Sequence, residues 1–147
     1  MASHCKLFYY KIELVRVLDG DTIDCKIDLG FSTWVHKRVR LAGIDTPESR
    51  TRNREEKRFG IRSKQFLSHA IGTKVEHGPL VGSDTNKELT LQSHGVGKFG
   101  RVLGVIFADG INVNELMVAT HHAVAYHGQS KQDIKVEHLK NRKRLTS

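Results

Sequence analysis

The sequence predicts an α+β fold, a single domain over residues 1–147 in which five strands form a closed barrel with about three helices. Three observations support this class. The first third of the chain holds three strand-like runs rich in β-branched and aromatic residues. A segment with apolar residues at helical spacing follows, and later strand-like runs precede two more helical segments. This order is typical of the five-stranded OB-type barrel.

The individual elements follow from local patterns. The first three strands are expected over residues 8–18, 21–29 and 32–43 as an antiparallel meander. A helix is expected from Arg54 to Ile71, because apolar residues recur at helical spacing and Gly72 follows. The remaining elements are expected in this order: strands over 74–81 and 88–93, a glycine-rich loop over 94–100, a strand over 101–107, a short helix over 112–119, and a final helix that includes Ile134 and Leu139.

The composition favours an anionic partner and argues against a membrane protein. The formal charge is +8 with a pI near 9.7, a balance that suits DNA or RNA. No run of 18 apolar residues and no signal-peptide pattern occur, so we expect no membrane span and a cytoplasmic monomer. A secreted chain after signal removal would look the same. Cys5 and Cys25 do not form a disulfide framework.

The stretch from Val39 to Glu48 has the layout of a site. A strand carrying Arg40 ends at Asp45, and Pro47 prevents the strand from continuing. Glu48 then stands at the start of a loop. The sequence thus holds an arginine and two carboxylates near one rigid strand end.

A second acidic stretch lies between the first two expected strands. Asp19, Gly20 and Asp21 form a tight-turn sequence, and most Asp-Gly pairs are only turns. The spacing does not fit an EF-hand calcium loop, because Ile23 and Asp24 occupy the fifth and sixth positions.

Taken together, these stretches resemble the thermonuclease (staphylococcal nuclease-like) family. The matching segments occur in the family's order over roughly residues 10–127: Asp19-Gly20-Asp21-Thr22, Arg40-Leu41, Ile44-Asp45-Thr46-Pro47-Glu48, Lys98-Phe99-Gly100-Arg101, Asp109-Gly110 and Val113-Asn114-Glu115. The resemblance implies the OB-type barrel already expected from the order of elements. It also implies a Ca²⁺-dependent endonuclease that cleaves DNA and RNA without sugar preference and leaves 3′-phosphates.

The resemblance further assigns roles to individual residues. It implies that Asp21, Asp45 and the Thr46 carbonyl bind Ca²⁺ directly, with Asp19 acting through water; carboxylates and carbonyls are ligands that Ca²⁺ prefers. Arg40 and Arg101 would then hold the scissile phosphate, since guanidinium groups bind phosphate with two parallel hydrogen bonds.

The remaining assignments concern the attacking water and the substrate. Glu48 would orient or deprotonate the water, and Lys98, Phe99 and Tyr126 would contact the substrate. The sequence departs from the family pattern at Phe99, where a tyrosine is usual, and at Gly97, where an acid is usual.

Two other functional classes are alternatives to the nuclease interpretation. One is a catalytically inactive OB-fold module that binds nucleic acid, although such modules usually lack the acids and arginines kept here. The other is an interaction protein that uses its basic segments, residues 50–64 and 131–144, to bind an acidic partner. A zinc site at His121, His122 and His127 is disfavoured, because no HExxH or CxxC motif accompanies them.

Overall fold

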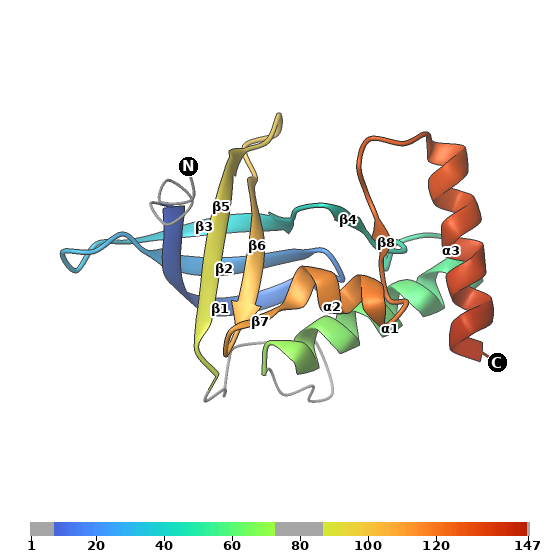
Figure 1. The fold of residues 1–147 in the computed structure, drawn as a ribbon, viewed down its shortest axis with the longest axis horizontal. Coiled ribbons are helices and arrows are strands. Elements are labelled where there is room, and N and C mark those ends of the chain that lie inside the picture. The colour runs from blue at the N-terminus through green and yellow to red at the C-terminus, as the bar shows by residue number, and fades with distance from the viewer. Residues whose placement is uncertain (1–7, 73–86, 147) are drawn as a thin grey trace.

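A computed structural model describes residues 8–72 and 87–146. Its main sheet contains the strands β1 (Tyr9–Asp19), β2 (Thr22–Asp28), β3 (Trp34–Leu41), β5 (Leu89–Val96) and β6 (Val102–Ala108). They pair in the order β3-β2-β1-β5-β6, and a parallel pairing between β3 and β6 closes the barrel. The predicted five-stranded barrel is therefore confirmed (Figure 1).

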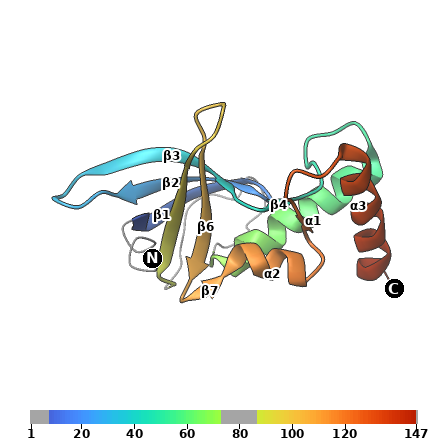
Figure 2. The same ribbon diagram turned by 45° about the horizontal axis from the view of Figure 1, so that its top comes forward.

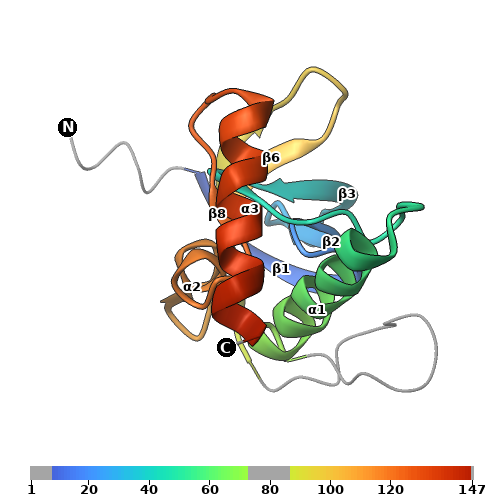
Figure 3. The same cartoon turned by 90° about the vertical axis from the view of Figure 1, so that its right-hand side faces the viewer.

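Three helices lie together beyond one end of the barrel. They are α1 (Arg54–Ala70), α2 (Val113–Ala119) and α3 (Lys131–Thr146), as the sequence predicts. Asn53 and Asn112 cap α1 and α2, each accepting a hydrogen bond from the third backbone N–H beyond it. Figure 3 shows α3 standing in front of the barrel with α1 and α2 on either side behind it. No helix in the described ranges is long and apolar enough to cross a membrane.

Alternation is clear at the end of β3 and along β6. On β3, Val39 and Leu41 are fully buried while Arg38 is exposed. On β6, the even-numbered positions from Val102 to Ala108 are buried. The helices add Leu67 and Ile71 from α1 and its end, and Val113 and Met117 from α2, to one continuous apolar cluster.

Buried Asn114 ties the end of β3 to β6. Its side-chain nitrogen donates to the carbonyls of Ala42 at 2.8 Å and Gly104 at 3.1 Å, and its oxygen accepts from the Ile106 N–H at 3.1 Å. The amide thus satisfies three backbone groups, two of them in buried residues. It fixes the corner from which the chain runs into Asp45.

Some predicted boundaries are wrong. The third strand ends at Leu41, and two short strands that the sequence does not indicate follow: β4 (Ile44–Asp45) pairs with β8 (Val124–Ala125). β5 continues to Val96, so the predicted loop over 94–100 shrinks to a turn over 97–100. A further short strand, β7 (Ile111–Asn112), pairs with β6. The strand predicted over 74–81 lies outside the described residues.

Candidate active site

Asp21 and Asp45 converge on one guanidinium group. Arg40 Nη2 lies 3.6 Å from Asp21 Oδ2 and 3.5 Å from Asp45 Oδ1. Arg40 Nη1 donates to the Leu41 carbonyl at 3.0 Å and the Ile44 carbonyl at 3.1 Å, which holds the side chain across the β3–β4 corner. All three side chains are at most 30% exposed, so water screens their attraction only partly.

The turn between β1 and β2 brings the amino-terminal acids to this site. Asp21 Oδ2 accepts the Thr46 N–H at 3.3 Å, and the Ser49 hydroxyl hydrogen-bonds to Asp19 Oδ1. A Cβ on Gly20 would come within 2.8 Å of the Ser63 Cβ and 3.0 Å of the Thr46 Cγ2. Glycine at this turn therefore permits the close approach that places two carboxylates against the loop after β4.

Glu48 lies near several other carboxylates. Burial raises the pKa of the Glu48 carboxyl, and the neighbouring carboxylates of Asp19, Asp21 and Asp45 raise it further. A depression of about 380 Å³ between the loop after β4 and α3 is lined by Glu48 together with Asp45 and Thr46. Four predicted acids are thus close enough to affect one another electrostatically.

The predicted phosphate and substrate contacts line a second depression of about 700 Å³. It contains Arg40 and Asp45 from the β3–β4 corner, Lys98, Phe99 and Arg101 from the β5–β6 turn, and Tyr126 after β8. Within the described ranges, no ion pair or side-chain hydrogen bond of the Arg101 guanidinium is seen. The structure thus brings Arg101 to the same hollow as Arg40, with donors available to a ligand.

Oxygen ligands for a cation are present, but their side chains do not form a compact cluster. Across the described part of the chain, no three Asp, Glu, His or Cys side chains are gathered as a metal-binding group. Asp21 and Asp45 nevertheless flank Arg40, and Thr46 lies beside Asp21, so that the two carboxylates and the Thr46 carbonyl offer oxygen ligands. This donor chemistry fits a hard cation such as Ca²⁺ rather than zinc.

His138 is a site residue that sequence reasoning missed. Its Nε2 lies 2.7 Å from Asp45 Oδ2, and the histidine side chain is only 13% exposed. The contact joins residues 93 positions apart, and His138 stands in a basic helix with no local motif around it. Only the docking of α3 reveals that this helix contributes to the site.

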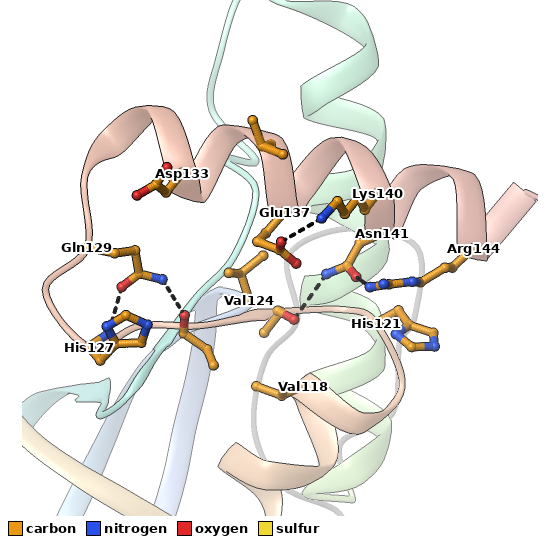
Figure 4. Close-up of a pocket in the computed structure, with 13 residues that line it drawn as sticks. Val118, His121, Val124, His127, Gln129, Asp133, Glu137, Lys140, Asn141 and Arg144 are labelled. Atoms are coloured by element: carbon orange, nitrogen blue, oxygen red, sulfur yellow. Dashed lines mark hydrogen bonds and ion pairs between the residues drawn. The ribbon is translucent and has the colours of Figure 1, made fainter.

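A further depression of about 840 Å³ lies elsewhere, between α3 and the segment around β8 (Figure 4). Its polar groups pair largely with one another: Gln129 with the backbone of Ala125 and His127, Lys140 with Glu137, and Asn141 with the Ala123 carbonyl. It contains none of the predicted site residues. We therefore place the candidate site at Arg40, Asp21 and Asp45.

Comparison with known proteins identifies the family of this chain. Residues 38–145 match the model of the family described as staphylococcal nuclease homologue. The chain belongs to this family. As a staphylococcal nuclease homologue it carries Arg40, Asp45, Glu48 and Arg101 within the matched segment, whereas Asp19 and Asp21 precede it.

Three relatives of this staphylococcal nuclease homologue illustrate the range of similarity. A micrococcal nuclease from Shigella flexneri is 32% identical over 126 residues, covering 80% of this chain and 59% of the relative. An uncharacterized endonuclease from Escherichia coli is 30% identical over 114 residues, covering 77% and 59%. An uncharacterized endonuclease from Haemophilus influenzae is 29% identical over 139 residues, covering 95% and 65%. The chain thus spans about three fifths of the length of these relatives.

Proposed function

We propose that this protein is a Ca²⁺-dependent endonuclease that hydrolyses phosphodiester bonds of DNA and RNA and leaves 3′-phosphates. The observation that carries the proposal is the convergence of Asp21 and Asp45 on Arg40, with Glu48 beside them. Membership of the family and the nuclease names of its relatives support the same reaction class.

Asp21, Asp45 and the Thr46 carbonyl are the groups that would hold Ca²⁺, with Asp19 reaching it through water. Bound there, the ion would neutralise charge on the phosphate oxygens and so lower the barrier to attack. The fit rests on the oxygen-only donor set and on the concentration of negative charge that raises the pKa of Glu48. A site this acidic favours a cation.

Arg40 and Arg101 would donate hydrogen bonds to the reacting phosphate. Arginine stays protonated at neutral pH, so its role is electrostatic stabilisation rather than proton transfer. Arg40 is already fixed by two backbone carbonyls, which lowers the cost of ordering it when substrate binds. Arg101, directly before β6, borders the same hollow.

Glu48 would act on the attacking water, since Asp21 and Asp45 are paired with Arg40 and Asp19 is hydrogen-bonded to Ser49. As a general base it needs hydrogen-bond reach to that water, and its place in the depression beside Asp45 allows this. Lys98, Phe99 and Tyr126 would contact the rest of the substrate. Phe99 is 85% exposed and so offers a ring face to a base.

The first experiment separates an enzyme from a binding module. Supercoiled plasmid, single-stranded DNA and RNA are incubated with the protein in Ca²⁺ and then in a calcium chelator. We expect cleavage of all three in Ca²⁺ only, with product ends that a phosphatase must treat before 3′ extension. Binding without cleavage in Ca²⁺ would instead support the inactive OB-fold module.

A further inference from the structure

Three neighbouring depressions on the outside of the barrel share lining residues. The site depression shares Phe99 and Arg101 with one of about 520 Å³. That one shares His36 with a third of about 480 Å³, which is lined by Trp34. The three depressions therefore mark a path from the candidate active site along β3 toward the β2–β3 hairpin, which projects away from the helices (Figure 2).

The alternation of β3 builds the floor of this path. Val39 and Leu41 point into the core, so the even-numbered residues of the strand face outward. Residues two apart on one face of a strand are roughly 7 Å apart. The outward row that begins at the candidate site is Arg40, Arg38, His36 and Trp34.

The path is cationic because its buried acid is neutralised. Asp24, on β2 beside Arg38, is within 3.0 Å of the Arg38 Nε and 3.1 Å of the Arg16 Nε. Burial would raise the pKa of Asp24, but hydrogen bonds and charge from both arginines outweigh it and lower the pKa. The cluster thus keeps one net positive charge. Lys37 comes from the opposite face of β3, but it is exposed and lines the same depression, so it adds a second charge, while Glu13 and Lys26 offset each other near Trp34.

Aromatic rings stand at both ends of the cationic stretch. Phe99 is 85% exposed and Trp34 is 40% exposed. Exposed rings beside basic side chains form the surface that single-stranded nucleic acids use, because unpaired bases can stack while phosphates contact the cations. The bases of a duplex are already stacked on one another, so they cannot use such rings in the same way.

We propose that this path, from Phe99 and Arg101 through Arg38 and Lys37 to Trp34, binds a single-stranded stretch of nucleic acid that continues beyond the cleaved bond. The identity of the ligand rests on the proposed function. Continuity with the candidate active site and charge complementarity single out nucleic acid as the occupant.

The test measures binding without cleavage. Labelled oligothymidylates of three and nine nucleotides are titrated against wild type, Trp34→Ala and Ile111→Ala in a calcium chelator. Ile111 is 57% exposed at β7, at the far end of β6, and serves as a matched loss of exposed apolar surface. Because one base stacked on an aromatic ring contributes about 1–3 kcal/mol, Trp34→Ala should cut the affinity gained between three and nine nucleotides by about tenfold or more. Ile111→Ala should leave that gain unchanged.

A second variant tests how much the positive charge of this path contributes to binding. Lys37→Gln should reduce the slope of log affinity against log salt for the longer strand by about 0.7, the share of one phosphate contact in single strands. Trp34→Ala should weaken binding with no change in that slope. The two signatures separate stacking from charge, and thermal melting of each variant shows whether it is folded.

Three outcomes would overturn the proposal: an undiminished length-dependent gain in folded Trp34→Ala, an unchanged salt slope in Lys37→Gln, or an equal loss on a duplex of the same length. These readouts do not need catalysis. A protein that binds as expected but never cleaves would contradict the proposed function and leave the proposed binding path intact. A protein that cleaves but shows none of these binding effects would contradict the binding path and leave the proposed function intact.

Discussion

Arg101 is the first residue after the β5–β6 turn, and its guanidinium faces the same hollow as Arg40. Arg101→Lys keeps the charge but loses the planar fork that donates two hydrogen bonds to a phosphate. We expect the rate of DNA cleavage to fall by about 10²–10³, the usual cost of losing one such donor, with an unchanged melting temperature. Single-turnover cleavage gives the rate and circular dichroism the stability. Wild-type turnover in the folded variant would remove Arg101 from the site.

His122 makes the protein sensitive to mild acid. Burial lowers the pKa of the imidazole to about 4, with help from Arg62 and His121, and its ring stacks on Phe66 at 4.2 Å between centroids. The unfolded chain binds a proton near pH 6.5 and the folded chain only near pH 4, so stability is complete above pH 6.5. It should fall by up to about 3 kcal/mol as the pH drops through that window.

Urea unfolding between pH 7 and 4 measures this effect. In His122→Gln the fall in unfolding free energy over this window should shrink. His94→Gln removes a histidine that is exposed and should keep the wild-type fall. The same pH dependence in wild type and His122→Gln would rule out His122 as its source.

At the scale of single residues, the sequence predicts which groups meet but not what holds them. Asp21, Asp45 and Arg40 lie together, as the resemblance to the thermonuclease family implies. His138 contacts Asp45 directly, and Asn114 holds the backbone of Ala42 between Arg40 and Asp45; both contacts span long separations in the chain. No local pattern encodes such a contact, because it depends on how α2 and α3 dock.

At the scale of elements, α1 positions Glu48 through a glycine. A Cβ on Gly60 would overlap the Glu48 carbonyl and the Ser49 nitrogen, both of them backbone atoms. Alanine favours a helix by about 0.5–1 kcal/mol over glycine, but this clash with backbone cannot be relieved by turning a side chain.

Gly60→Ala should therefore destabilise the protein by about 1–3 kcal/mol and lower cleavage by moving Glu48. Thermal melting and single-turnover rates measure the two effects. Gly97→Ala is the matched control for stability, since its Cβ would meet nothing nearer than 3.6 Å. A stability gain in Gly60→Ala would mean that α1 does not pack this closely against the loop after β4.

Element types were easier to predict than their ends. The barrel strands and all three helices follow from alternation, helical spacing and caps. The prediction fails where the length of a strand depends on its pairing partner. β5 continues to Val96 because β6 pairs with it, although Gly95 and the nearby glycines suggest a loop. Likewise, β4 and β8 are strands of two residues that exist only through each other.

At the scale of the whole molecule, two basic segments flank the site. The residues before and within α1 and the exposed face of α3 carry most of the cationic side chains, and the sequence carries a net charge of +8. Few aromatic residues accompany them, so their contact with nucleic acid should be made to phosphates. The affinity for duplex DNA should then fall steeply with salt.

Fluorescence anisotropy with a labelled duplex between 50 and 200 mM salt measures this dependence, and a protein that makes 6–10 phosphate contacts loses roughly 10³–10⁵ in affinity over that range. Charge reversal at Lys143 on α3, which is exposed, should lower the slope. An affinity that does not change with salt would exclude these segments as the nucleic-acid surface.

Asp21 and Glu48 are proposed to serve the same site in different ways. The test is single-turnover cleavage of a labelled oligonucleotide, titrated with calcium, for wild type, Asp21→Asn and Glu48→Gln. An amide at Asp21 removes a charged oxygen ligand, so half-maximal activity should move to higher calcium. An amide at Glu48 should lower the maximal rate with little change in the calcium midpoint, because a water-orienting group acts mainly in the transition state. Equal and calcium-independent cleavage by all three proteins would contradict a metal-assisted site at Asp21, Asp45 and Glu48.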